Sequence, residues 1–269
     1  MGPLVVIVAL VALALLVSAL ERRRPAGPAR SWSRWRELPY WLLTPLVSRI
    51  VTRTAIVLAA VVLALALGVP LATDALRAHY EAPTWLDSLP APLAALLVLL
   101  VADLVGYWAH RAFHRGWLWR VHAVHHASER LDWLAAVRVH PLDDLLGGVI
   151  RAIPLLALGV RPGTLGVLVP LLTLHAILLH ANVRWDYGPL RYVIASPAFH
   201  RWHHAKSERS VNYAGLFPFL DLLFGTYHCP PGELPQETGV AGEDPVPDGF
   251  LAQLAYPLRP TDHTTPPRH

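Results

Sequence analysis

The chain has 269 residues, of which 54% are hydrophobic and only 16% are charged; this is unlike an ordinary soluble protein and favours an integral membrane protein. Its net charge of +4 does not indicate nucleic-acid binding, because the arginines flank apolar stretches instead of following one polar face. The single cysteine, Cys229, excludes an intramolecular disulfide and a thiolate-rich zinc or iron–sulfur site, so any bound metal must have nitrogen and oxygen ligands.

Four or five apolar stretches are long enough, or nearly long enough, to cross a bilayer, for which a helix needs about 20 residues. They cover residues 3–20, 54–72, 90–109, 145–160 and 163–181. The first is followed by three arginines, whereas a secretory signal carries its positive charge before the apolar run, so we interpret it as a retained anchor. The last two are joined by the turn signal Arg161-Pro162-Gly163 and are expected to form a helical hairpin that enters and leaves on one face.

The loop charges predict the orientation in the membrane. Residues 21–53 carry eight arginines, whereas residues 73–89 carry one arginine and three acidic residues. Because cytoplasmic loops are rich in arginine and lysine, the first loop is expected in the cytoplasm and the second outside. The chain after residue 109 then returns to the cytoplasmic membrane surface. Residues 32–51 mix tryptophan, tyrosine and arginine, which suits the headgroup layer, and Pro39 argues against one unbroken helix there.

We therefore expect an all-α fold: an integral membrane bundle of about four to five apolar helices with a cytoplasmic, histidine-rich helical cap. Residues 1–89 are expected to form an N-terminal membrane anchor region with two apolar helices, and the motif resemblance given below implies a catalytic domain over residues 90–228. Residues 229–269 are expected to form an extended or disordered tail, because nine prolines fall within residues 230–269 and there is little apolar periodicity.

Eleven of the fifteen histidines lie between residues 110 and 204, and most of them follow helical spacings. One pair is spaced i, i+4, and two triplets share the spacing i, i+3, i+4, which presents three imidazoles on one face of a helix. The pair is His110 and His114, and the triplets are His122, His125, His126 and His200, His203, His204. A lone histidine is more often a hydrogen-bonded core residue, but three such clusters beside apolar stretches favour metal binding.

The metal itself is not determined by these spacings, because neutral imidazole suits zinc, copper, iron and nickel. The eight clustered histidines exceed the ligands that one zinc ion takes, so two metal ions are indicated. Neither the Glu-x-x-His pairs of soluble di-iron bundles nor the His-Glu-x-x-His motif of metalloproteases occurs in the sequence.

A series of motifs over about residues 95–228 resembles the fatty acid hydroxylase/sterol desaturase family, the membrane histidine-box di-iron oxygenases. In chain order they are Asp103-Leu-Val-Gly-Tyr-Trp-Ala-His110-Arg-Ala-Phe-His114, His122-Ala-Val-His125-His126, Arg138-Val-His140-Pro141, His180-Ala-Asn182, His200-Arg-Trp-His203-His204, Asn212-Tyr-Ala-Gly215 and Phe224-Gly-Thr-Tyr227. The resemblance implies a helical membrane enzyme with a cytoplasmic dimetal centre, usually described as di-iron, that oxidises sterols, fatty acids or related lipids with O2.

Matching these motifs position by position implies nine metal ligands: His110, His114, His122, His125, His126, His180, His200, His203 and His204. His175, five residues before His180, is a further candidate ligand or a helix histidine that faces a neighbour. His140 is expected near the metal ligands or in a structural role. Asp103 lies seven residues before His110 on the same helical face, so it is expected to orient a ligand imidazole or to pair with an arginine. The carboxylates Glu129, Asp143, Asp144 and Asp221 lie near the motifs and receive no assignment.

The function hypothesis is that two iron ions and O2 as co-substrate oxidise a C–H bond of a lipid, giving an alcohol, or a double bond after a second hydrogen loss. The sequence shows no flavin or nicotinamide fingerprint, so an external electron donor is expected, either a ferredoxin or a cytochrome b5-like protein. Two alternatives stay open: a zinc-dependent membrane hydrolase with the same ligands, and a non-catalytic membrane protein that binds metal.

Overall fold

The computed structural model describes residues 3–28, 37–242 and 245–259. These residues form ten α-helices and four short 3-10 helices, and they contain no β-strand, only isolated bridges between Pro25 and Val183 and between Ala205 and Thr238. The α-helices are α1 (Pro3–Arg23), α2 (Leu38–Leu67), α3 (Thr73–Glu81), α4 (Ala91–Phe113), α5 (Gly116–His126), α6 (Pro141–Ala157), α7 (Pro162–His180), α8 (Pro197–His203), α9 (Phe219–Leu223) and α10 (Phe250–Ala255). The 3-10 helices are η2 (Trp85–Ser88), η3 (Trp133–Val137), η4 (Gly188–Tyr192) and η5 (Tyr256–Leu258). The predicted all-α fold is confirmed.

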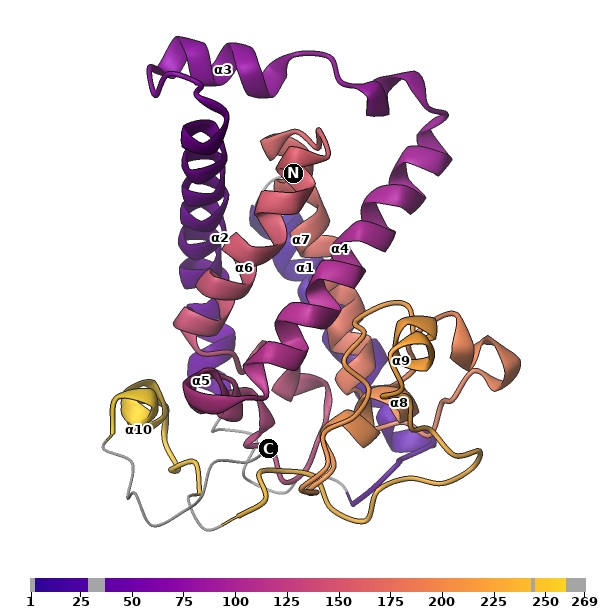
Figure 1. Ribbon diagram of the computed structural model, residues 1–269. Coiled ribbons are helices and arrows are strands. Elements are labelled where there is room, and N and C mark those ends of the chain that lie inside the picture. The colour runs from indigo at the N-terminus through magenta and orange to yellow at the C-terminus, as the bar shows by residue number, and fades with distance from the viewer. Residues whose placement is uncertain (1–2, 29–36, 243–244, 260–269) are drawn as a thin grey trace.

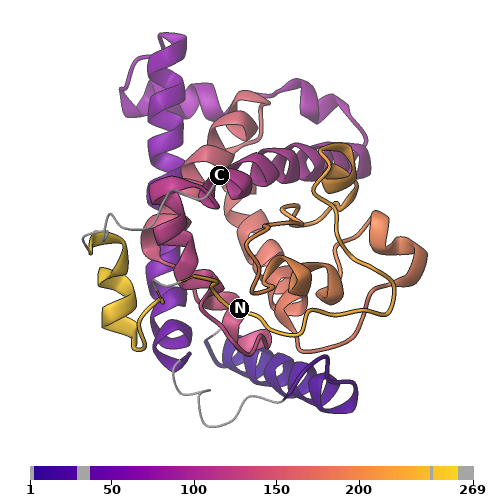
Figure 2. The same cartoon turned by 60° about the horizontal axis from the view of Figure 1, so that its bottom comes forward.

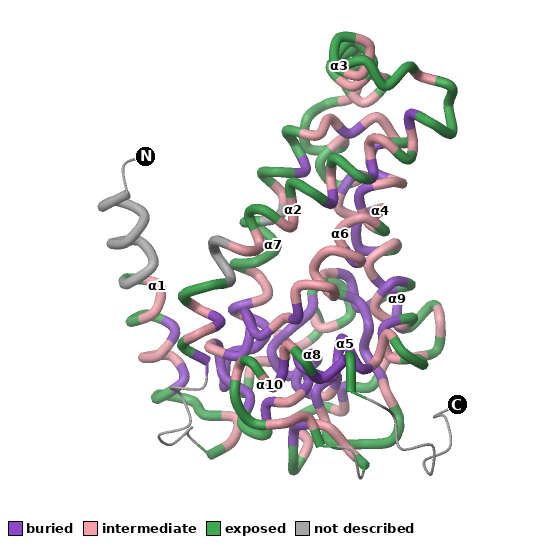
Figure 3. Tube along the Cα trace, turned by 90° about the vertical axis from the view of Figure 1, so that its left-hand side faces the viewer, coloured by how far each residue is buried: buried purple, intermediate pink, exposed green. Residues whose placement is uncertain are grey.

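Three helices of the described residues are long and apolar enough to cross a membrane: the part of α2 from Val47 to Leu67, α4 and α7. Their outer faces expose large apolar side chains such as Val57, Leu93 and Val167, which is the arrangement expected of helices that contact lipid. Figure 3 shows this contrast: the long helices are exposed or half-buried over much of their length, whereas the end that holds α5 and α8 is largely buried. The chain is therefore a membrane protein.

The helix α6 differs from the other apolar helices, because with 17 residues it falls short of a full span. It lies between α2 and α4 and packs against both (Figure 1). The contact with α2 is close at Gly148, where an added Cβ would lie 2.9 Å from the Cβ of Ala55. A short turn joins α6 to α7, as predicted, but α7 alone is long enough to cross a membrane.

The helix α2 corrects the prediction of an interrupted interfacial segment at residues 32–51. It runs without a break for 30 residues, and Pro39 lies in its first turn, where the missing N–H would have no partner inside the helix in any case. The earlier part of that segment, with Trp32, Arg34, Trp35 and Arg36, lies outside the described residues.

The two ends of the bundle differ in structure. The connection that contains α3 and η2 lies at one end, and the short helices α5, α8 and α10 lie at the opposite end (Figure 1). Figure 2 shows this second end facing the viewer, with the last described segment of the chain beside the start of α2. All the clustered histidines belong to this end.

The C-terminal segment is more ordered than the extended or disordered tail that its composition predicts. Residues 250–258 form α10 and η5, and the Tyr256 side chain is buried against Tyr40 and α5. The Tyr40 hydroxyl donates to the Gln253 side chain at 2.7 Å, and Arg120 donates to the Tyr256 carbonyl at 3.1 Å. Tyr256 and Phe250, whose ring centroid lies 4.9 Å from that of Tyr40, thus anchor the segment, although their spacing gives no periodic signal. The boundaries of the three predicted regions stay predictions.

Candidate metal centre

The ends of four helices carry the clustered histidines. The end of α4 provides His110 and, as the residue after the helix, His114. The other histidines are His122, His125 and His126 on α5, His180 as the last residue of α7, His200 and His203 on α8, and His204 directly after α8. The short helix α8 is started by Ser196, whose hydroxyl accepts a hydrogen bond from the Phe199 N–H at 3.2 Å.

Nine imidazoles converge in two groups, and the nine are those that the motif match assigns as ligands. Within each group the possible ligand atoms all lie within 4.8 Å of one another. The five-histidine group consists of His110, His114, His122, His126 and His203, and the four-histidine group consists of His125, His180, His200 and His204. The groups adjoin, because the rings of His126 and His204 are stacked with their centroids 4.3 Å apart. The arrangement suits two neighbouring cations.

The distances between nitrogen atoms fit metal coordination. Two imidazole nitrogens bound to one ion at about 2.1 Å, at angles between square and tetrahedral, lie roughly 3.0–3.4 Å from each other. The Nε2 atoms of His110 and His122 are 3.0 Å apart, and the Nε2 atom of His200 lies 3.2 Å from that of His180 and 3.1 Å from that of His204. In addition, the buried Nε2 atoms of His114, His126 and His203 have no hydrogen-bond partner among the described residues. A cation between the rings would satisfy these nitrogens.

The protonation state of the rings also suits a metal. Burial lowers the pKa of the six imidazoles outside the membrane-spanning helices well below the usual value, and neighbouring histidines lower it further. These six are His114, His125, His126, His200, His203 and His204. A metal binds the neutral form of imidazole, so the fold keeps these side chains in the form that can coordinate.

Hydrogen bonds on the outer side of the rings fix which nitrogen faces the centre. The Nδ1 atom of His110 lies 2.8 Å from the Tyr213 carbonyl, and the Nδ1 atom of His203 lies 2.8 Å from the Val211 carbonyl. A carbonyl can only accept, so each Nδ1 carries the proton and each Nε2 lone pair points inward. His122 is held in the same way by Asp143, whose carboxylate lies 2.6 Å from Nδ1.

Two buried carboxylates hold the loop that supplies these carbonyls. Asp103 accepts backbone N–H groups from Gly215, Leu216 and Phe217 at 2.6–3.0 Å. Asp221 accepts the N–H groups of Tyr213 and Ala214, at 2.7 and 2.9 Å. The prediction that Asp103 orients an imidazole directly is therefore wrong, because both of its oxygens are used by the backbone of the loop.

Asn212 fastens the same loop to its neighbours. Its side-chain amide donates to the carbonyls of Phe199 and His228 and accepts the His228 N–H, at 2.7–2.8 Å. The backbone of Asn212 has a φ of 60°, a left-handed conformation that asparagine tolerates better than most residues. The loop is thus joined to α8 and to the chain beyond α9.

The structure does not bring His175 and His140 into either group. The Nε2–H of His175 donates to the Gly215 carbonyl at 3.1 Å, and the side chain is half-buried. His140 begins α6: its Nδ1 accepts the Leu142 N–H at 3.1 Å, and its Nε2–H donates to the Leu254 carbonyl at 3.1 Å. The contacts of His140 are those of a helix cap that also holds the C-terminal segment.

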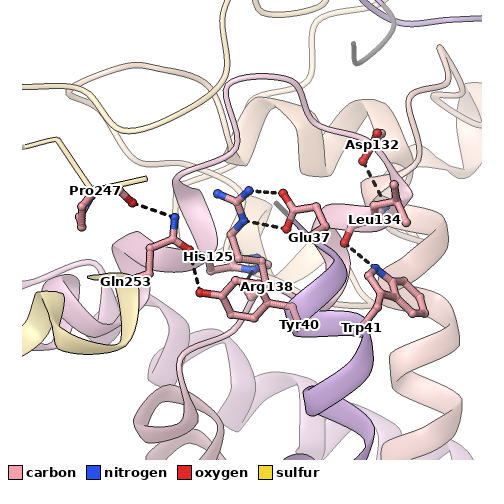
Figure 4. A network of polar contacts seen from close by, with 9 residues as sticks. All are labelled: Glu37, Tyr40, Trp41, His125, Asp132, Leu134, Arg138, Pro247 and Gln253. Atoms are coloured by element: carbon pink, nitrogen blue, oxygen red, sulfur yellow. Dashed lines mark hydrogen bonds and ion pairs between the residues drawn. The ribbon is translucent and has the colours of Figure 1, made fainter. Parts of the chain in front are cut away.

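A buried ion pair lies next to His125 (Figure 4). Arg138 and Glu37 form a two-pronged pair, and both side chains are almost fully buried. The Arg138 carbonyl accepts the Nδ1–H of His125 at 3.0 Å. Nearby, the Trp41 indole donates to the Leu134 carbonyl at 2.9 Å, so the start of α2 holds the backbone that orients His125. Sequence reasoning missed this pair, because its partners lie 101 residues apart and follow no motif spacing.

Replacing Glu37 with glutamine is expected to lower the free energy of unfolding by about 3–5 kcal/mol, because it leaves the Arg138 charge buried without its partner. Thermal or denaturant unfolding in detergent measures this loss. The matched control is Glu81→Gln, which breaks an exposed pair with Arg77 and is expected to cost about 0–0.5 kcal/mol. Equal small losses in both variants would contradict a stabilising role for the buried pair.

Fold and site together define a helical membrane protein with a buried, histidine-lined centre that could hold two metal ions. Comparisons with known proteins identify the family to which this membrane protein belongs. The fatty acid hydroxylase family model matches residues 95–226, and through these residues the chain belongs to that family. The matched residues include all nine clustered histidines.

Several curated proteins are similar to the chain. An ornithine lipid hydroxylase of Rhizobium tropici is 36% identical over 182 residues, which is 66% of this chain and 54% of that protein. An alkylglycerol monooxygenase of Danio rerio is 32% identical over 134 residues, covering 49% of this chain and 30% of that protein. A very-long-chain aldehyde decarbonylase of Oryza sativa subsp. indica is 30% identical over 150 residues, covering 52% and 56%. The chain thus spans about half the length, or less, of these relatives. No solved structure matches the chain.

Proposed function

We propose that the chain is a membrane di-iron oxygenase that hydroxylates a C–H bond of a lipid with O2. The observation that carries the proposal is the pair of adjoining groups of five and four buried imidazoles at one end of the helical bundle. The family membership and the names of the relatives, a lipid hydroxylase and a monooxygenase among them, support the same reaction class.

Two iron ions, held by the nine histidines, would supply the activation of O2 and the oxidation of the C–H bond. The overall reaction consumes R–H, O2, two electrons and two protons and gives R–OH and water. The electrons have to come from an external donor, for which we propose a ferredoxin or a cytochrome b5-like protein. The protein's own contribution is to fix the imidazole orientations through the Tyr213, Val211 and Arg138 carbonyls and the Asp143 carboxylate.

We propose that the metal centre lies on the cytoplasmic side of the membrane. Of the arginine-rich segment, Arg22 and Arg23 end α1 and Arg24 follows it, at the same end of the bundle as α5 and α8, whereas α3 and η2 lie at the other end (Figure 1). By the positive-inside rule the arginine-rich end faces the cytoplasm. A lipid could then keep its polar end at the membrane surface while its chain stays in the bilayer.

The proposal predicts that the protein, purified without O2, contains about two iron ions per chain and transfers one atom of ¹⁸O2 to a membrane lipid when supplied with electrons. Metal analysis measures the first and mass spectrometry of extracted lipids the second. The same preparation loaded with zinc serves as the control and should incorporate no label. If the zinc protein cleaves a lipid and the iron protein oxidises none, the hydrolase is the correct function; exchangeable metal without any product indicates a metal-binding protein.

A further inference from the structure

The helix α6 carries one basic residue, Arg151, at a depth where the surrounding side chains are apolar. The next residue, Ala152, belongs to a buried apolar cluster together with Ala59 of α2 and Ala102 of α4. A charged side chain among membrane-embedded helices is costly and is usually retained for a function.

Two glycines make room for the Arg151 side chain. An added Cβ on Gly147 would lie 3.0 Å from the guanidinium, and an added Cβ on Gly106 of α4 would lie 3.8 Å from the Arg151 Cδ atom. Gly106 is one helical turn before His110. The guanidinium therefore folds back along α6 toward its start, and it lies close enough to His110 of the five-histidine group to interact with it electrostatically.

The nearby carboxylates do not hold this guanidinium. Asp143 accepts from His122 at 2.6 Å, and Asp144 accepts the Ser48 hydroxyl at 2.9 Å. Arg151 interacts with both acids at longer range, but no hydrogen bond or close ion pair is found for it within the described part of the chain. A guanidinium has five N–H donors, and in an apolar environment each one without an acceptor is unfavourable.

We propose that Arg151 binds the anionic oxygen group, a carboxylate or a phosphate, of a lipid that enters the metal centre from the bilayer. The guanidinium forms two parallel N–H···O hydrogen bonds with such a group and places the neighbouring carbon atoms next to the five-histidine group. This inference rests on the proposed function for the identity of the lipid as substrate, whereas the binding itself needs no turnover.

The test measures lipid binding to the metal-loaded protein in neutral detergent without O2, by native mass spectrometry. The probes are palmitate and phosphatidic acid, which separate a carboxylate from a phosphate, together with methyl palmitate and phosphatidylcholine as uncharged and zwitterionic counterparts. We expect Arg151→Gln to weaken binding of one anionic probe about 10- to 100-fold, the size of a lost charged hydrogen bond, and to leave the two counterparts unchanged. The affinity of Arg151→Lys for that anionic probe should lie between those of the wild type and Arg151→Gln, because lysine keeps the charge and loses the two-pronged geometry.

The matched control is Arg22→Gln, which removes an exposed arginine at the end of α1 and should leave binding as in the wild type. If the wild type and Arg151→Gln bind each anionic probe equally tightly, the proposal is overturned. Arg151 is then a counter-charge for Asp143 and Asp144. An equal loss in Arg22→Gln overturns it as well, since the effect is then general surface charge. If Arg151→Gln does not fold, the wild type decides: the proposal requires tighter binding of palmitate than of its methyl ester, or of phosphatidic acid than of phosphatidylcholine. Loss of binding in Arg151→Gln by a protein that oxidises no lipid would refute the proposed function and leave the anion site standing.

Discussion

Replacing His203 with alanine is expected to remove one of two bound metal ions and to reduce lipid oxidation at least ~100-fold. His203 is buried, and its ring centroid lies 4.3 Å from that of His110 and 4.7 Å from that of His126. Within the part of the chain that the structure describes, its Nε2 has no hydrogen-bond partner. Loss of a residue that hydrogen-bonds a metal ligand already costs about 10- to 100-fold in metal affinity or activity. Loss of the ligand itself should therefore cost at least the upper end of that range.

The measurement is the number of metal ions per chain together with the rate of lipid oxidation. His200→Ala is the companion variant, because it removes a member of the four-histidine group and should deplete the other ion. His79→Ala is the matched control: His79 is exposed on α3, at the opposite end of the bundle, and its loss should change neither quantity. Two ions retained in His203→Ala would contradict the role of His203 as a metal ligand of the five-histidine group.

Replacing Asp221 with alanine is expected to lower the free energy of unfolding by about 3–5 kcal/mol. The carboxylate is fully buried and accepts the N–H groups of Tyr213 and Ala214 and the hydroxyl of Thr226. Alanine leaves these donors buried without an acceptor, and each such donor costs about 1–3 kcal/mol. The loop then no longer holds the Tyr213 carbonyl against His110, so metal affinity should fall together with stability.

Unfolding in detergent and metal content are measured on the same preparations. Asp221→Asn should be less damaging, since one side-chain oxygen remains as an acceptor. Asp186→Asn is the control, because Asp186 forms a partly exposed pair with Arg191 that is worth at most about 1 kcal/mol. A variant Asp221→Ala that unfolds like the wild type and keeps both metals would rule out the positioning role of this carboxylate.

The convergence of the clustered histidines could be predicted from the sequence because their spacing has a simple physical meaning. Residues at i, i+3 and i+4 share one face of any helix, so the triplets at 122–126 and 200–204 had to present their rings together. His175 and His180 are five residues apart, which turns the two side chains to different faces of α7. Accordingly His180 joins the four-histidine group, whereas His175 donates to the Gly215 carbonyl.

The carboxylates were harder to interpret, because a carboxylate near a metal motif can bind an imidazole, an arginine or the backbone. Asp143 binds His122, whereas Asp103 and Asp221 bind the backbone of the loop at residues 213–217. The three carboxylates have different partners because the tertiary fold decides which segment lies next to each of them. The same reason hides the pair of Glu37 and Arg138, whose partners meet only when α2 packs beside η3.

The sequence by itself determined the membrane class and the helical fold, because composition and apolar length act within single helices. Its motifs also indicated the family and the nine histidines that converge. Only the tertiary structure decided how the nine divide into groups of five and four, since the division separates His125 from its neighbours His122 and His126 on the same helix. It also decided that the Tyr213, Val211 and Arg138 carbonyls orient three of the rings. The physical reason is that local spacing sets the direction of a side chain along its own helix, whereas the packing of four helix ends sets which side chains meet.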